Sequence, residues 1–106
     1  MPYEVKTTAE FDACLSEAVA YRVDNYGLRS ARRLLDAVDE TSGLLAGSPL
    51  CGSPVDTNPS DVLAACLRWT RIDSYIAIYR ADEDSRVVYL LKLLHGTSSW
   101  RRRVLS

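Results

Sequence analysis

Apolar and polar positions along the chain follow two periods, and the switch between them divides the sequence into elements. Residues 3–7 (YEVKT) alternate apolar and polar side chains, which predicts a short strand. A helix to about Asn25 is predicted next, with a capping box formed by Thr7 and Glu10 at its start. Its inward stripe, at spacings of three and four, consists of Phe11, Cys14, Leu15, Ala18, Val19 and either Arg22 or Val23.

A second helix is predicted directly after Asn25-Tyr26-Gly27, because Asn and Gly tolerate the positive φ that ends a helix. Gly43 or Gly47 is expected to close it. Two helices joined so tightly form an antiparallel hairpin. The inward stripe of the second helix is predicted to be Ala31, Leu34, Leu35, Val38 and Leu45.

The second half of the chain is rich in β-forming residues. A proline- and glycine-rich loop at 47–61 precedes three runs at 63–72, 74–82 and 85–95, whose short connections predict an antiparallel meander. The expected fold is therefore α+β, with the order strand, helix, helix and three-stranded meander, and with the helical hairpin packed on one sheet face. Strict alternation in the last run would put Tyr89, Leu91, Leu93 and His95 on one face and Arg86, Val88, Leu90, Lys92 and Leu94 on the other, and leaves open which face the helices cover.

Length and composition narrow the class of protein. A chain of 106 residues with 47% apolar and 25% charged side chains fits a single globular domain, expected to span residues 1–106 with a basic C-terminal tail at 97–106. The longest apolar run, Val87 to Leu94, is too short to cross a bilayer, and the N-terminus lacks the apolar core of a signal peptide. We therefore expect a cytoplasmic protein without membrane contact.

The cysteines and the single histidine give no pattern typical of a disulfide framework or a metal site. Cys14, Cys51 and Cys66 are odd in number and irregularly spaced, so buried, unpaired thiols are expected, and whether they matter for function stays open. No cofactor and no metal are predicted. Residues 1–61 carry ten acidic and five basic side chains, whereas residues 62–106 carry four acidic and eight basic ones. This asymmetry suits an anionic partner, although a chance distribution of solvated charges would look the same.

The candidate catalytic and binding residues lie in the second half of the chain. RNA cleavage needs a base for the 2′-OH, an acid for the leaving oxygen and cations for the charged transition state. His95 could serve as acid or base, and charge could come from Arg68, Arg71, Arg80 and Arg101 to Arg103. A lone histidine at a strand end is also a common structural residue. Trp100 and Arg101 to Arg103 could either anchor and solvate the tail or contact a target or partner. The binding residues expected on the tail are thus Trp100, Arg101, Arg102 and Arg103.

Four strings, taken in order, resemble the RelE/ParE superfamily of toxins from type II toxin–antitoxin systems, with a ParE-like ending. YEVKTTAEFDACLSEAVAYRVDNYG is similar to the opening strand and first helix, GLRSARRLLDAV to the second helix, and LLAGSPLCG to the loop that follows. LRWTRIDSYIAIYRADEDSRVVYLLKLLHGTSSW is similar to the meander. The resemblance implies a growth-inhibiting toxin of a plasmid-stabilising kind of system, held inactive by a cognate antitoxin.

Two activities occur in the superfamily, and two positions bear on the choice between them. Ribonuclease members typically carry an arginine after the tyrosine that starts the middle strand, where this chain has Ile76, and some place a tyrosine where it has Gly96. The resemblance therefore favours binding and poisoning of DNA gyrase over ribosome-dependent cleavage of messenger RNA. An inert member that only binds its antitoxin is a further alternative.

Overall fold

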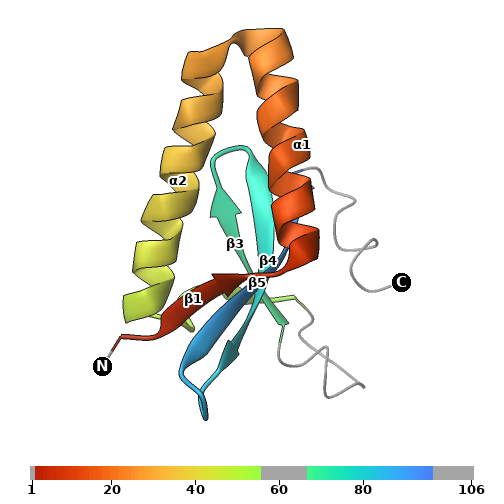
Figure 1. Ribbon diagram of the computed structural model, residues 1–106. Helices are drawn as coiled ribbons and strands as arrows, with labels where there is room; N and C mark the ends of the chain where they lie inside the picture. Colours follow the sequence, from red (N-terminus) through yellow and green to blue (C-terminus); the bar gives the residue numbers. More distant parts are fainter. Residues whose placement is uncertain (1, 56–66, 97–106) are drawn as a thin grey trace.

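Two long helices form a hairpin that covers one face of a mixed β-sheet (Figure 1). The computed structural model describes residues 2–55 and 67–96. The predicted fold class and the packing of the hairpin on one sheet face are confirmed. The elements are β1 (Glu4–Thr7), α1 (Ala9–Tyr26), α2 (Leu28–Gly47), β2 (Ser53–Pro54), β3 (Leu67–Ile72), β4 (Tyr75–Asp82) and β5 (Val87–His95).

The sheet has the order β1-β5-β4-β3-β2. Strands β3, β4 and β5 form the predicted antiparallel meander, and β1 lies parallel to β5. The two-residue strand β2 pairs with β3 and was not predicted, because Ser53 and Pro54 lie in a segment whose composition is typical of a loop. The hairpin therefore carries the chain from one edge of the sheet to the other.

The first helix begins one residue later than the capping box predicts. Thr8, and not Thr7, is the N-cap, and its hydroxyl oxygen accepts from the amide of Phe11 at 3.1 Å. Thr7 is held in the extended strand by its pairing with Leu90 of β5, so it cannot cap. Glu10 instead forms an ion pair with Lys92 at 3.6 Å, so the predicted capping box is wrong.

The junction between the helices is a single glycine. Gly27 has φ +93°, a conformation that favours glycine, and its amide donates to the carbonyls of Arg22 and Val23. At the last position of the α1 stripe Arg22 is buried while Val23 is exposed. The α2 stripe is confirmed except at Leu35, which is 42% exposed on the outer face of the hairpin and was wrongly predicted to point inward.

A β-bulge in β5 decides which of its side chains face the helices. Ile78 pairs with Lys92 while Tyr79 pairs with Leu90, so Leu91 is an extra residue in β5 and the two faces exchange there. The predicted strict alternation is therefore wrong. Val88, Leu90 and Leu93 all belong to the core under the helices, and the opposite face carries a separate cluster of Val55, Ile76 and Ile78.

Neither α1 nor α2, the helices of the described segments, is long and apolar enough to cross a membrane.

Candidate functional site

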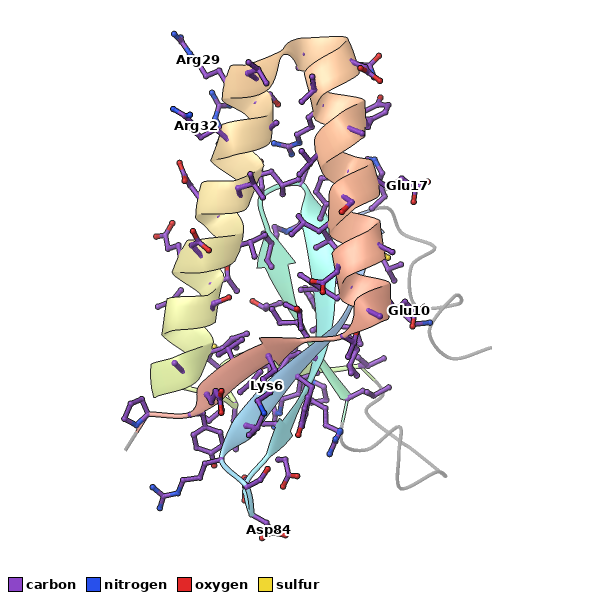
Figure 2. All side chains as sticks on the ribbon, in the orientation of Figure 1. Lys6, Glu10, Glu17, Arg29, Arg32 and Asp84 are labelled. Carbon is purple, nitrogen blue, oxygen red and sulfur yellow. The ribbon has the colours of Figure 1, made fainter. Side chains whose placement is uncertain are left out.

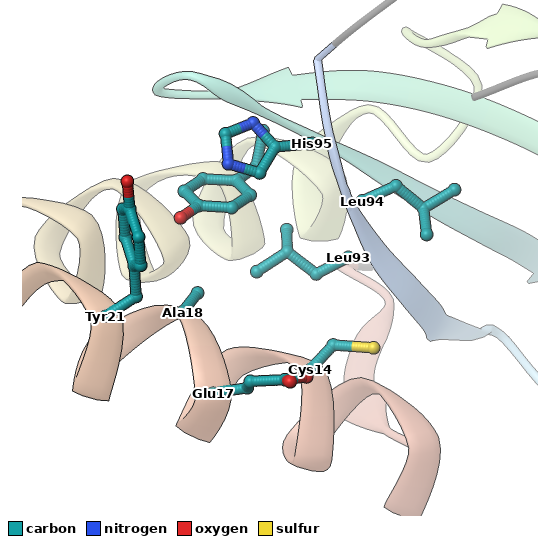
Figure 3. A pocket seen from close by; sticks show the side chains of 8 residues that line it. Cys14, Glu17, Ala18, Tyr21, Leu93, Leu94 and His95 are labelled. Atoms are coloured by element: carbon teal, nitrogen blue, oxygen red, sulfur yellow. The ribbon is translucent and has the colours of Figure 1, made fainter. Parts of the chain in front are cut away.

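A pocket of about 440 Å³ lies between α1 and the C-terminal end of β5. Figure 3 shows Tyr21 and Ala18 of α1 on one side and Leu93 and His95 of β5 on the other. Its position follows from the bulge, which turns His95 toward the helix-covered side of the sheet, in register with Tyr75 of β4. The lining residues are Cys14, Glu17, Ala18, Tyr21, Tyr75, Leu93, Leu94 and His95.

A chain of contacts fixes the wall of this pocket. The ring of His95 lies against that of Tyr75, with centroids 5.0 Å apart and planes tilted by 46°. The guanidinium carbon of Arg22 lies 5.4 Å from the centroid of the same tyrosine ring. Arg22 in turn forms an ion pair with Asp73 at 2.7 Å, so the position of the histidine depends on a charge pair at the end of the sheet.

Arg22 is the buried charged residue of the described core. Its guanidinium donates to the carbonyl of Ser30 in α2 at 3.2 Å and to the hydroxyl of Ser74 at 2.9 Å. Burial would lower the pKa of Arg22, but the hydrogen bond and charge of Asp73 outweigh burial and leave that pKa raised. The group stays charged, and it ties both helices to the β3–β4 turn, where Asp73 itself has φ +55°.

The pocket combines aromatic surface with one carboxylate. Glu17 is the acidic residue of the lining, and no lysine or arginine belongs to the lining among the residues that the structure describes. The neighbouring Tyr26 raises the pKa of Tyr21, so the Tyr21 hydroxyl is neutral and can donate a hydrogen bond at neutral pH. Such a pocket suits an apolar or aromatic side chain better than a phosphate.

Arg68, one of the predicted catalytic cations, lies far from His95. It pairs across the sheet with Tyr79, whereas His95 pairs with Tyr75, four residues away along β4. At a rise of ~3.3 Å per residue the two positions are separated by about 13 Å along the strand. The Arg68 guanidinium donates to the carbonyls of Gly52, at 2.6 Å, and Leu50, at 3.2 Å, so it holds the loop after α2 against the sheet.

Arg80, the other predicted cation, points to the opposite face of the sheet. It pairs with Tyr89, and its guanidinium carbon lies 5.0 Å from the centroid of that ring. The described residues therefore do not bring Arg68, Arg80 and His95 together. Arg71 lies nearer to His95, because its Nη1 would be 3.1 Å from a Cβ at the adjacent Gly96. The predicted binding residues Trp100 and Arg101 to Arg103 lie outside the described residues, and their assignment stays a prediction.

Gly96 follows His95 at a point where the backbone of the β3–β4 turn comes very close. Its amide donates to the carbonyl of Ser74 at 3.1 Å. A Cβ atom added at Gly96 would lie 2.8 Å from that carbonyl oxygen, so a larger residue requires the turn to move. This backbone has no room for a tyrosine at the position where some ribonuclease members carry one.

The two described cysteines do not form a site. Cys14 is half-buried in the pocket wall and Cys51 is exposed, so the prediction of a buried thiol is wrong for Cys51, while Cys66 lies outside the described residues. Within residues 2–55 and 67–96 no group of histidine, cysteine or carboxylate side chains could hold a metal ion.

The element order, the helical hairpin on one sheet face and the strand order β1-β5-β4-β3-β2 define a small α+β fold, and comparisons with known proteins identify its family. The family described as "ParE toxin of type II toxin-antitoxin system, parDE" matches residues 5–100. No curated protein matches the chain by sequence. The chain belongs to the ParE toxin family and is a toxin of a type II toxin–antitoxin system.

Three solved structures show the same fold. A chain of the RelBE2 toxin–antitoxin complex from Mycobacterium tuberculosis is 25% identical, with a TM-score of 0.63 over 90% of this chain and 99% of that one. A chain of the chromosomal ParDE system from P. aeruginosa is 16% identical, with a TM-score of 0.69 over 90% and 97%. A chain of the archaeal RelE–RelB complex from Pyrococcus horikoshii is 21% identical, with a TM-score of 0.53 over 92% and 99%.

Replacing Arg22 with methionine tests the contact chain under the pocket. We expect Arg22→Met to lower the free energy of unfolding by about 2–3 kcal/mol, because it leaves Asp73 without its charge partner and removes the hydrogen bonds from the guanidinium to Ser30 and Ser74. This loss is smaller than that for a fully buried ion pair, because the Asp73 side chain is 30% exposed and water can solvate it. Urea denaturation measures the change, and Arg33→Met, at an exposed position of α2, is the matched control. Equal losses in the two variants would contradict this role.

Two glycine replacements test the close approach at Gly96. Gly96→Ala should destabilise the protein by about 1–3 kcal/mol, because the new Cβ overlaps the Ser74 carbonyl. Gly43→Ala, inside α2 near its C-terminal end and with open space around it, should stabilise by about 0.5–1 kcal/mol through helix propensity. Thermal unfolding of both variants checks the pair, and the account fails if Gly96→Ala is as stable as the wild type.

Proposed function

We propose that this toxin inhibits growth by binding and poisoning DNA gyrase in the cytoplasm, and that a cognate antitoxin neutralises it. The observation that supports binding over cleavage is the separation of His95 from Arg68 and Arg80, two of the cations that could serve RNA cleavage. Arg68 is engaged by loop carbonyls, and Arg80 stacks on Tyr89 on the other sheet face. Nη1 of Arg71 would lie 3.1 Å from a Cβ at Gly96, so one cation approaches the end of β5, but Arg68 and Arg80, which would supply further charge to a phosphoryl transition state, do not.

The residues around His95 strengthen this argument. The charged neighbour in the described lining of its pocket is Glu17, whose carboxylate would repel an RNA phosphate. Ile76, at the position where ribonuclease members carry an arginine, is 1% exposed and packs in the cluster on the opposite face. The described surface near His95 is therefore better suited to contacting a protein than to cutting RNA.

A cognate antitoxin is proposed as the second partner. The solved structures similar to this chain come from RelBE2, ParDE and RelE–RelB toxin–antitoxin systems, two of them described as complexes. Family membership supports the same organisation here, in a system of the plasmid-stabilising kind.

The alternative is a ribosome-dependent endoribonuclease of the RelE type. It is favoured by the 25% identity to a chain of the RelBE2 complex and by the exposed imidazole of His95, which would act as acid or base with Arg68 and Arg80. This alternative requires Arg68 to leave its loop carbonyls and Arg80 to reach across the sheet.

Induction of the wild type and of His95→Ala in a bacterial host separates the two activities. We expect both proteins to arrest growth, with intact messenger RNA on ribosomes and altered supercoiling of a reporter plasmid, because the imidazole is one contact of a binding surface and is not needed for bond breaking. Primer extension and plasmid topology measure the two outcomes, and antitoxin binding serves as the folding control. Loss of toxicity in His95→Ala together with cut transcripts in the wild type would make the ribonuclease the correct assignment.

A further inference from the structure

The side of α2 that points away from the sheet carries a line of apolar and charged residues. Leu28, Arg32, Leu35, Asp39 and Gly43 follow one another at spacings of three or four, so they lie along one side of the helix. All five are exposed, and the two leucines are 77% and 42% exposed. These five residues form what we call the outer α2 face. Exposed apolar side chains that lie together in this way mark interaction surfaces.

The apolar part of the outer α2 face continues onto α1. Leu28 and Leu35 also line a groove of about 620 Å³, and Val19 and Val23 of α1 form its other wall. Burying this apolar surface against a partner would recover free energy that is forgone while it stays in water.

The charged side chains of α2 are segregated along the helix. Its first two turns hold only basic ones, and the next two turns hold only acidic ones. Figure 2 shows Arg29 and Arg32 projecting outward from the upper end of α2. None of the six charged residues of α2 forms an ion pair with another part of the described chain. They are Arg29, Arg32, Arg33, Asp36, Asp39 and Glu40.

This order of charges is unfavourable for a helix on its own. The helix dipole favours acidic residues in the first turn and basic residues in the last turn, and α2 has neither. Like charges also lie four positions apart at Arg29 and Arg33 and at Asp36 and Glu40, where they repel each other. A second α2 helix laid antiparallel would offset both effects, because its acidic turns would face the basic turns of the first.

We propose that the outer α2 face binds a second copy of this chain, with the two α2 helices antiparallel about a two-fold axis between Leu35 and Asp36. In a two-fold contact every pair of residues occurs twice. With the axis at this place, Arg32 of each copy lies opposite Asp39 of the other copy. The two Leu35 side chains then meet beside the axis and form the apolar centre of the contact.

The same register also places the most exposed leucine opposite the smallest residue of the face. Leu28 of each copy lies opposite Gly43 of the other copy. No atom lies within 4 Å of the point where a Cβ would stand at Gly43, so the leucine side chain has room there. Both the charge order and the side-chain sizes of α2 are therefore complementary to themselves when the helix is reversed.

This self-association is independent of the proposed function. The pocket beside His95 shares no residue with the outer α2 face, and the contact requires neither gyrase nor an antitoxin.

The test is sedimentation equilibrium of the purified full chain over a range of concentrations. The wild type should change from the mass of one chain to that of two as its concentration rises. Arg32→Asp and Asp39→Arg should each raise the Kd of the dimer about tenfold or more, because each substitution places like charges opposite one another twice. Higher salt concentration should weaken the wild-type dimer.

Mixing the two charge variants tests the register itself. The Arg32→Asp copy presents two carboxylates on its outer α2 face, and the Asp39→Arg copy presents two guanidinium groups. The mixture should therefore form a dimer that neither variant forms alone at the same concentration. Misfolding of either variant would not produce this result.

Leu35→Asp tests the apolar centre of the contact and should also raise Kd about tenfold or more. Arg33→Asp and Leu44→Asp are the matched controls, because both residues are exposed on α2 but lie off the outer α2 face. Both controls should keep Kd within about threefold of the wild type. Circular dichroism shows whether each variant is folded.

Three results would overturn the proposal. A wild type that keeps the mass of one chain at every concentration would leave the outer α2 face to a different protein. A dimer that Leu35→Asp and both charge variants leave unchanged would place the contact elsewhere on the chain. Failure of the two charge variants to associate when mixed would rule out the pairing of Arg32 with Asp39.

Discussion

The ion pair between Arg22 and Asp73 joins the helical hairpin to the end of the sheet, and the candidate site depends on it. A buried guanidinium must have its donors satisfied, and here one ion pair and two hydrogen bonds reach α2 and the β3–β4 turn. The same group lies over the ring of Tyr75, which lies against His95. Any change that frees Arg22 therefore loosens the hairpin, the turn and the pocket wall together.

The sheet itself limits what chemistry the described residues can perform. Successive side chains of a strand point to opposite faces, so Ile76 and Arg80 of β4 cannot share a site with His95, which faces the helices. Arg68 shares the helix-covered side but is held by backbone carbonyls some distance along the sheet. The pocket beside His95 combines aromatic surface with one carboxylate, which is the composition of a protein-binding surface.

Periodicity was enough to predict both helices, the meander and the packing of the hairpin, because those features depend on local spacing. It failed where tertiary contacts decide: strand pairing moved the helix cap from Thr7 to Thr8, and the bulge at Leu91 reversed the faces of β5. Of the pocket residues on α1, periodicity assigns Cys14 and Ala18 only to the inward stripe and does not single out Glu17 or Tyr21. One signal in the sequence pointed to this site: Arg22 is a charged residue in an apolar stripe. A buried charge requires a partner, and here that partner comes from another part of the fold.

The central claim is that this toxin acts by binding gyrase and not by cutting RNA. The most direct measurement incubates the purified toxin with purified gyrase, supercoiled plasmid and ATP, stops the reaction with detergent and protease, and quantifies linear DNA. The account predicts linear DNA that accumulates with toxin concentration and does not appear when gyrase is left out. Absence of linear DNA with active toxin, together with cleavage of messenger RNA on purified ribosomes, would contradict it.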